Sequence, residues 1–394
     1  MTEVILHIGA GKTGSTALQN FLSYNRGALA ARQVAYPRLP GPDTDRPGVA
    51  HNPLAYALMA GAGETSLRAA RRALESAARS ADRIILSAEV FYMRPREQEF
   101  GDDFEGYARA KRDGIRATAE LLSGFTVRPI CYVRRQDHWL ESVYQERVKT
   151  WKPVEPDAAA FAERIREPHF RWQLDLWAKQ FGEQNIVVRP YDRARMRGGD
   201  VIDDFLAATG LPTGEGLTRP PDTVHTRNPR LSRDVFELQR ILRQLAPRDE
   251  DKRSLQEALY ELSEQERGRR GDDPPTWAAL LEPAERQRIL ERFAPENRAV
   301  ARRFLGRDDG ALFPEDADAT PPPPDEPYPG LGAARAVELT LELQQIRVRP
   351  RHVAVRTLGT VRRWIHTRAA WLRPVLSPAG RVLEQLRQRR RRGY

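Results

Sequence analysis

The sequence predicts an α/β fold in which helices flank a parallel sheet, and the alternation of strand-like and helix-like segments supports this prediction. Short apolar runs rich in β-branched residues alternate with longer stretches of helical periodicity as far as Pro190. Such alternation is typical of strand–helix–strand units, whose crossover helices cover a parallel sheet. The expected strands are Val4–Ile8, Gln33–Tyr36, Arg83–Ser87, Thr126–Val133 and Asn185–Pro190. The expected helices are Thr16–Ala31, Ser66–Ser80, Tyr107–Ser123, Asp137–Lys149 and Arg171–Phe181.

The second half of the chain shows helical periodicity only. Residues 212–313 are expected to form the mainly helical part of one domain that spans residues 1–315. The run Thr320–Asp325 contains four consecutive prolines and indicates a stiff linker over residues 316–330. Residues 331–394 are expected to form an Arg-rich, partly amphipathic helical tail.

Composition and charge narrow the class of protein. Of the 394 residues 40% are apolar, which is enough to bury a core. The formal charge of +10 is concentrated in residues 331–394, where 15 arginines and 3 glutamates give +12 and leave −2 for the rest. The single cysteine, Cys131, excludes a disulfide framework and is expected in a buried strand. The chain opens without a secretory-signal pattern, so we expect a cytoplasmic protein.

The stretch HIGAGKTGST, residues 7–16, combines features of several phosphate-binding loops. Its glycines fit a dinucleotide fingerprint, but no acid for the ribose follows before Asp43, and only Arg38 could serve an NADP-type site. A Walker A loop needs a glycine where Leu6 stands, although Gly11-Lys12-Thr13 matches its end. A P-loop kinase that uses ATP and Mg²⁺ remains an alternative.

A third interpretation requires only a compact loop that leads from a strand to a helix N-terminus, where free amides attract an anion. Lys12 supplies a point charge there, and Thr13, Ser15 and Thr16 supply hydroxyl donors around Gly14. This loop resembles that of the PAPS-dependent sulfotransferases, Lys-[Ser/Thr]-Gly-[Ser/Thr]-Thr, where PAPS is 3′-phosphoadenosine 5′-phosphosulfate. Gly11 stands where that family has proline.

A second motif strengthens this resemblance. Arg134 ends an expected strand, and Ser142 follows eight residues later on an expected helix whose start Asp137 can cap. The pair resembles the family's 3′-phosphate motif, with Arg135-Gln136 in place of its usual Asn-Pro pair. The resemblance covers roughly residues 1–313 and includes features of bacterial sulfotransferases.

Two further residues follow from the resemblance. Tyr191, at the end of a late strand, matches the tyrosine that the family places near the adenine. Arg227 lies roughly where the family brings a second arginine to the 3′-phosphate.

The resemblance implies an enzyme that moves a sulfuryl group from PAPS to an acceptor hydroxyl, with adenosine 3′,5′-bisphosphate (PAP) as product. Lys12 then has a catalytic as well as a binding role. The expected base is Glu89, after an apolar strand, with His51 as the alternative; His7 is expected in the core. No metal is expected, because the spacing of His and Cys fits no metal site.

Partners are inferred from the acceptor chemistry and from the tail. The expected acceptor is a carbohydrate or lipid-linked glycan. The tail alternates apolar residues such as Val355 and Trp364 with arginines, which suits peripheral attachment to an anionic membrane at its inner face. Capture of a polyanionic acceptor, or a solvated tail, are alternatives, and no nucleic-acid partner is expected. A non-catalytic nucleotide-binding adaptor, with the tail as its working part, is the alternative from another class.

Overall fold

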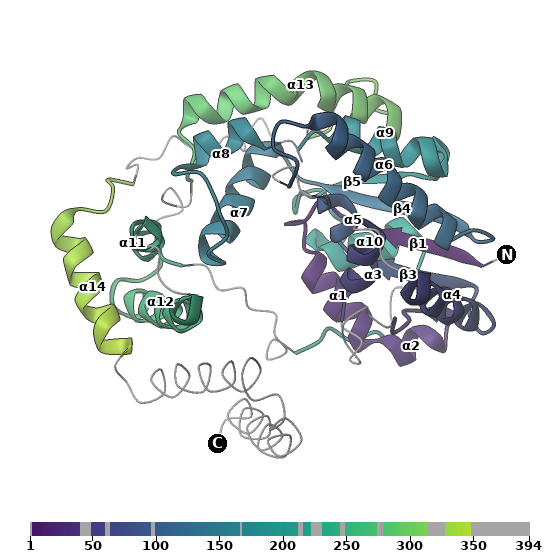
Figure 1. Ribbon diagram of the computed structural model, residues 1–394, viewed down its shortest axis with the longest axis horizontal. Coiled ribbons are helices and arrows are strands. Elements are labelled where there is room, and N and C mark those ends of the chain that lie inside the picture. The colour runs from purple at the N-terminus through teal and green to yellow at the C-terminus, as the bar shows by residue number, and fades with distance from the viewer. Residues whose placement is uncertain are drawn as a thin grey trace, which may run out of the picture. The chain divides into compact units, whose positions relative to one another are not determined.

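Five parallel strands form one sheet, which confirms the predicted fold class (Figure 1). The computed structural model describes residues 2–39, 49–59, 64–95, 99–165, 168–211, 216–221, 231–244, 249–273, 277, 279–313 and 328–347. The strand order is β2-β3-β1-β4-β5, with β1 in the centre. The strands are β1 Glu3–His7, β2 Val34–Ala35, β3 Arg83–Ser87, β4 Thr126–Val133 and β5 Val187–Pro190. All five coincide with or fall almost wholly within the expected runs.

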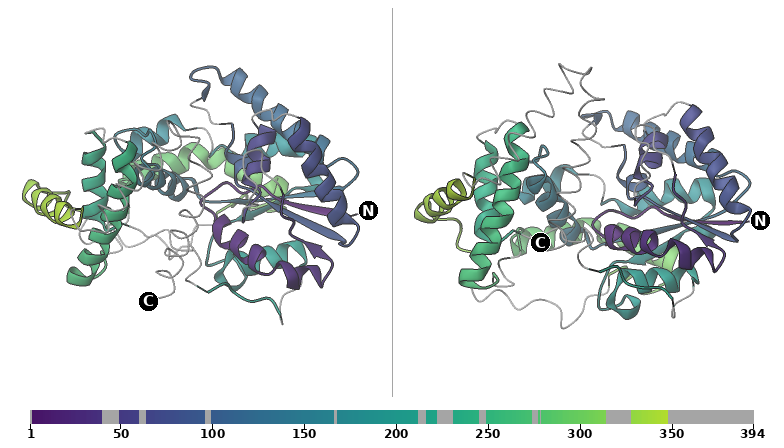
Figure 2. Two further views of the ribbon diagram at one scale, coloured as in Figure 1. Left: turned by 60° about the horizontal axis from the view of Figure 1, so that its bottom comes forward. Right: turned by 90° about the horizontal axis from the view of Figure 1, so that it is seen from below.

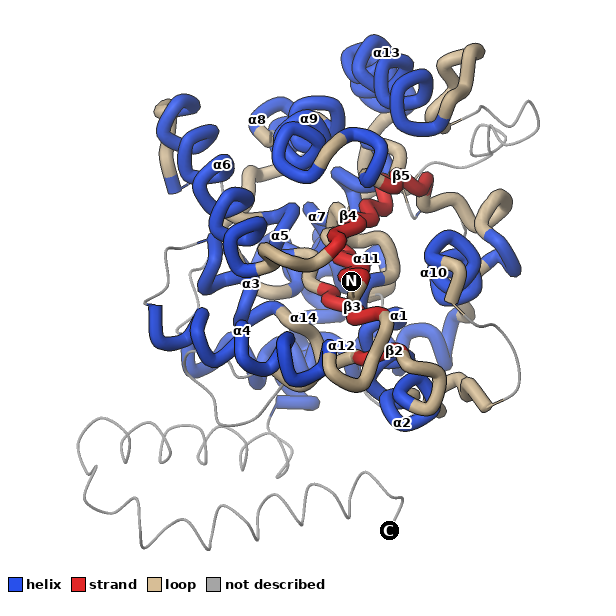
Figure 3. The backbone as a smooth tube through the Cα atoms, turned by 90° about the vertical axis from the view of Figure 1, so that its right-hand side faces the viewer, coloured by secondary structure: helices blue, strands red, loops and turns tan. Residues whose placement is uncertain are grey.

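Helices cover both faces of this sheet (Figure 3). The described residues form the helices α1 Ser15–Tyr24, α2 Arg26–Ala30, α3 Asn52–Met59, α4 Glu64–Ala78, α5 Val90–Met93, α6 Phe104–Leu121, α7 Gln136–Lys149, α8 Ala158–Arg164, α9 Phe170–Phe181, α10 Val201–Thr209, α11 Arg233–Gln244, α12 Asp249–Arg270, α13 Pro283–Leu305 and α14 Ala333–Arg347. Two short 3₁₀ turns are η2 Glu183–Asn185 and η3 Arg197–Gly199.

The core has two layers because successive strand residues point to opposite faces. In β1, Val4 and Leu6 pack among residues of α3, α4, α6 and α9. Ile5, between them, packs on the other face with residues of α1, α2 and α10. Such continuous burial on both faces is typical of a parallel sheet.

One expected helix is divided. The span Thr16–Ala31 was expected to be a single helix, but α1 ends at Tyr24 and α2 begins at Arg26. Asn25 separates them, since its side-chain amide donates to the carbonyls of Phe21 at 2.8 Å and Thr218 at 2.9 Å.

The described residues belong to two compact units. Unit 1 falls within Met1–Glu146, Val154–Asn228 and Ala279–Pro323 and contains the sheet. Unit 2 falls within Arg147–Pro153, Pro229–Ala278 and Pro324–Tyr394. In unit 2 the helices α11, α12 and α14 lie side by side (Figure 2). Residues 333–347, expected in the tail, thus form a helix packed within unit 2.

The topology determines where a site can form. Because the strands are parallel, the segments that follow β1, β3, β4 and β5 all leave the same edge of the sheet. This carboxyl edge carries the loop at residues 8–14, Glu89, Arg134 and Tyr191. No helix in the described ranges is long and apolar enough to cross a membrane.

Candidate anion-binding site

The loop after β1 is tightly fixed to the sheet and to α7. The amides of Ile8 and Ala10 donate to the carbonyls of Ile130 and Tyr132 at 3.0 and 3.1 Å. The indole of Trp139 donates to the Ala10 carbonyl at 2.8 Å. These bonds hold the first part of the loop between β4 and the start of α7.

The loop also contains unusual backbone conformations. Lys12 has φ 54°, in the left-handed region that residues other than glycine rarely adopt. Gly14 has φ 77°, and a Cβ there would lie 2.8 Å from Cγ1 of Val201. Gly14 is therefore required by both backbone and space, which explains the glycine in Lys-Thr-Gly-Ser-Thr.

The N-terminus of α1 is ready to accept an anion. Gly14 is the N-cap residue, no side chain caps the helix, and its first turn contains no acid. The first intrahelical bond runs from the Leu18 amide to the Gly14 carbonyl, so the amides of Ser15, Thr16 and Ala17 have no intrahelical acceptor. Free amides and the positive end of the helix dipole together favour a negatively charged ligand.

The loop hydroxyls differ in their surroundings. Thr13 is fully buried, and its Oγ1 has no hydrogen-bond partner among the described residues. Thr13 Oγ1 lies close to Gly9, because a Cβ on Gly9 would be 3.7 Å from it. Ser15 is buried and Thr16 is exposed. These positions place one unsatisfied hydroxyl inside the loop and another hydroxyl on its outer side.

His7 is a core residue, as expected. It is fully buried, and its Nδ1 lies 2.8 Å from the Ser87 hydroxyl on the neighbouring strand β3. Burial lowers the pKa of His7 to about 4, so the imidazole is neutral at pH 7. It therefore adds no positive charge beneath the loop.

Arg134 and Arg135 have different partners. Arg134 is half-buried, donates to the Lys12 carbonyl at 3.2 Å, and lies 5.8 Å from the ring centroid of Tyr191. Within the described ranges it forms no ion pair, and burial lowers its pKa. Arg135 instead forms two hydrogen bonds of 2.8 Å to Asp137. The arginine that faces the loop is therefore Arg134, as the motif predicts.

Asp137 has a different role from the helix cap that the sequence suggests. It is fully buried in the first turn of α7 and accepts from Arg135 and from Arg286 on α13. Burial raises its pKa, but the hydrogen bond from Arg135 and the nearby cations prevail and lower it to about 2. Arg286 also binds Glu141 at 2.9 Å, so this cluster joins α7 to α13.

One face of α7 lines the loop. Trp139, Ser142 and Glu146 follow at spacings of three and four residues and thus share a face of the helix. Trp139 binds the Ala10 carbonyl, and the Glu146 carboxylate lies 3.0 Å from Nζ of Lys12. Ser142, half-buried between these two contacts, is therefore on the side of α7 that faces the loop.

Glu89 stands beside the loop on the neighbouring strand. It follows β3, which pairs with β1 in a register that joins His7 to Ser87. Its Oε2 accepts from Gln19 of α1 at 3.0 Å, and its Oε1 accepts from Asn52 of α3 at 3.3 Å. Two amide donors thus hold a half-buried carboxylate at the carboxyl edge of the sheet, where it can accept a proton.

His51 does not fit the role of a base. Its Nδ1 accepts from the Ser87 amide at 3.0 Å, and its Nε2 lies 2.8 Å from the Pro37 carbonyl. Because Nδ1 accepts, the proton is on Nε2, and both ring nitrogens are occupied. Burial lowers the pKa of His51 to about 4. The structure therefore favours Glu89 of the two candidates.

Most of the residues expected in the site lie at one edge of the sheet. The adjacent strands β3, β1, β4 and β5 bring together Glu89, the Lys12 loop, Arg134 with Ser142, and Tyr191. Arg227 lies outside the described residues. The sequence reasoning missed Gln19, Asn52 and Glu146. Helical spacing from Ser15 to Gln19 and from Ser142 to Glu146 could have indicated two of them.

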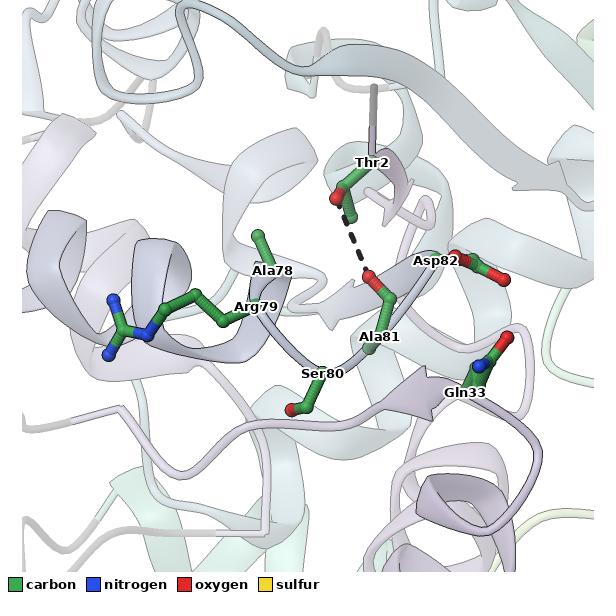
Figure 4. Close-up of a pocket in the computed structure, with 7 residues that line it drawn as sticks. All are labelled: Thr2, Gln33, Ala78, Arg79, Ser80, Ala81 and Asp82. Atoms are coloured by element: carbon green, nitrogen blue, oxygen red, sulfur yellow. Dashed lines mark hydrogen bonds between the residues drawn. The ribbon is translucent and has the colours of Figure 1, made fainter.

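A surface cavity lies at the opposite edge of the sheet (Figure 4). It has a volume of about 400 Å³, and its lining includes Thr2, Gln33 and Asp82, which precede β1, β2 and β3. The Thr2 hydroxyl donates to the Ala81 carbonyl at 3.4 Å there. This cavity is therefore separate from the candidate site. The described residues contain no group of three or more His, Cys, Asp or Glu placed to hold a metal ion.

Comparisons with known proteins give the fold no family name. No family model matches the chain. A protein from Archaeoglobus fulgidus, described only as uncharacterized, is 33% identical over 178 residues. The match covers 45% of this chain and 45% of the relative, so the chain spans less than half of that protein's length.

Proposed function

We propose that the protein is a PAPS-dependent sulfotransferase that acts on an acceptor hydroxyl. The observation that carries the proposal is Arg134, a half-buried cation that forms no ion pair among the described residues and is held against the carbonyl of Lys12. Asp137 and Glu141 offset part of this charge without forming an ion pair with Arg134, and a bound anion would compensate the rest. Arg134 and the uncapped N-terminus of α1 are therefore two neighbouring anion-binding features. Such a pair suits a ligand that carries two separate phosphates.

The residues present fit PAPS, and each has a distinct task in the proposed reaction. Lys12 and the first-turn amides of α1 stabilise the charge that develops on the departing 5′-phosphate. Arg134 and Ser142 hold the 3′-phosphate, and Tyr191 packs near the adenine. Glu89 accepts the proton of the acceptor hydroxyl while the oxygen of that hydroxyl bonds to sulfur. The expected acceptor is a carbohydrate or a lipid-linked glycan.

Ligand-induced stabilisation tests this proposal against a P-loop kinase. PAP should raise the melting temperature of the full chain more than AMP or ATP with Mg²⁺ does, because only PAP carries the 3′-phosphate that Arg134 binds. A ligand that binds only the native state stabilises it by about RT ln(1 + [L]/Kd). Equal shifts from PAP and AMP would contradict the role of Arg134, and a larger shift from ATP with Mg²⁺ would favour the kinase.

Turnover separates the enzyme from a nucleotide-binding adaptor. Radiolabelled PAPS should label one class of glycan in a screen of candidate acceptors, with the Lys12→Ala chain as the inactive control. Tight PAP binding without transfer to any acceptor would support the adaptor instead.

Peripheral attachment to the inner face of an anionic membrane is also part of the proposal. Its support is the charge of +12 in residues 331–394, most of which lie outside the described residues. Clusters of arginine close to a membrane surface attract anionic lipid.

A further inference from the structure

The loop lysine already has an anionic neighbour. Nζ of Lys12 lies 3.0 Å from Oε2 of Glu146, and the two side chains are 25% and 28% exposed. Glu146 belongs to the face of α7 that also supplies Trp139 to the loop. Helix α7 therefore positions the carboxylate next to the Lys12 ammonium, the group that an incoming anion would bind.

This neighbour opposes anion binding. An ammonium group has three donors, so Lys12 can contact Glu146 and a second anion together. A ligand oxygen bonded to the same Nζ then lies within about 6 Å of the carboxylate, because each contact is about 3 Å long. Two anions at that distance repel, and partial burial leaves the repulsion only partly screened.

We infer that Glu146 is a resident counter-ion of Lys12 that limits the affinity of the loop for anions. The inference rests on the proposed function for the choice of PAP as ligand, but it applies to any phosphate at the loop. If Glu146 instead served only to align Lys12, removal of its carboxylate would weaken anion binding. Removal of a counter-ion would strengthen it. The sign of the change in affinity therefore decides between the two roles.

Titration calorimetry of the full chain with PAP and with pyrophosphate tests the inference. Glu146→Gln keeps the size of the side chain and removes its charge, and it should bind both ligands about three- to tenfold more tightly. Its affinity should also fall more steeply with salt, since the site has gained net positive charge. Glu146→Asp, which keeps the charge, should show no gain.

Glu75→Gln is the matched control. Glu75 pairs with Arg71 on the surface of α4, and its substitution changes the net charge of the chain by the same amount. It should leave both affinities unchanged, which would attribute the gain to the position of Glu146 rather than to total charge.

Each other outcome has a definite meaning. Unchanged or weaker binding by Glu146→Gln overturns the counter-ion role. If the wild-type chain binds pyrophosphate but not PAP, the proposed function fails while the pyrophosphate series still decides the role of Glu146. If neither the wild type nor the variant binds either ligand, the loop is no anion site and both proposals fail.

Discussion

At the residue scale, the neighbours Arg134 and Arg135 provide a matched pair for mutation. Arg134→Ala should weaken PAP binding by roughly 10- to 100-fold, the range for a hydrogen bond to a charged group. Arg135→Ala should leave PAP affinity near normal, because Arg135 is committed to Asp137, and should instead lower the free energy of unfolding. Calorimetry with PAP and urea unfolding of both variants measure these effects.

Arg134→Lys refines this comparison. Lysine keeps the charge but cannot form the two parallel bonds of a guanidinium, so its PAP affinity should lie between those of the wild type and Arg134→Ala. The assignment fails if Arg135→Ala loses PAP affinity while Arg134→Ala does not.

The carboxylate of Glu89 supports a prediction about turnover. Glu89→Gln retains the shape of the side chain but cannot accept the proton, so kcat should fall about a hundredfold or more. PAP affinity should stay near normal, because Glu89 contacts Gln19 and Asn52 rather than the Arg134 side of the loop. Single-turnover kinetics with PAPS and an identified acceptor measure the first effect. An active Glu89→Gln chain would remove Glu89 as the base.

At the scale of elements, His51 joins β3 and α3 to the segment that follows β2. Its ring bonds the Pro37 carbonyl and the Ser87 amide, and its own carbonyl accepts from Ala55 in the first turn of α3. A buried histidine whose pKa is lowered to about 4 contributes its stability above pH 6.5 and loses it as the pH falls towards 4. The loss can reach roughly 2–3 kcal/mol.

His51→Gln should therefore show a shallower fall in the free energy of unfolding between pH 6.5 and 4 than the wild type. Part of the fall should remain, because His7 also has a pKa lowered to about 4 by burial. Urea titrations at several pH values measure it. A fall as steep as in the wild type would show that His51 does not carry this dependence.

Some elements could not be predicted because distant residues determine them. The break between α1 and α2 depends on Asn25, which binds Thr218, 193 positions away in sequence. Asp137 is likewise engaged by a distant residue, Arg286 of α13, 149 positions away in sequence. Local propensity contains no record of such contacts, so a helix through residue 25 and an Asp137 cap were the reasonable expectations.

The sequence was sufficient to predict which residues lie at the carboxyl edge of the sheet, but not all of their contacts. Lys12, Arg134 and Ser142 follow from local motifs, and parallel topology is sufficient to bring them to one edge. His51 was a candidate because it follows a Pro-Gly-rich loop, and only the structure shows that the chain buries it against the backbone. No motif places an acid beside a phosphate loop, so Glu146 could have been found only through its spacing of four residues from Ser142 on α7.

At the scale of the whole molecule, the strands were predictable because strands buried on both faces of a parallel sheet consist of continuous apolar runs. The residue at which the tail begins could not be predicted from the sequence. In α14, Leu339, Leu343 and Ile346 are buried in unit 2, and Arg335 lies 3.1 Å from Asp234 of α11. A cut near Pro323 would therefore remove a packed helix, and a cut after Arg347 is the appropriate test of the tail.

Residues 348–394 contain 13 arginines and one glutamate, so a chain that ends at Arg347 loses a charge of +12 while it keeps α14. It should retain its melting temperature and PAP affinity, and it should lose attachment to vesicles that contain phosphatidylserine. Each arginine near such a surface contributes about 1 kcal/mol, screened by salt, so the intact chain should also detach as ionic strength rises. Co-sedimentation with anionic and with neutral vesicles measures both effects. Equal binding of the two chains to anionic vesicles would refute the membrane role of the tail, and a lower melting temperature of the shorter chain would show that residues 348–394 stabilise the fold.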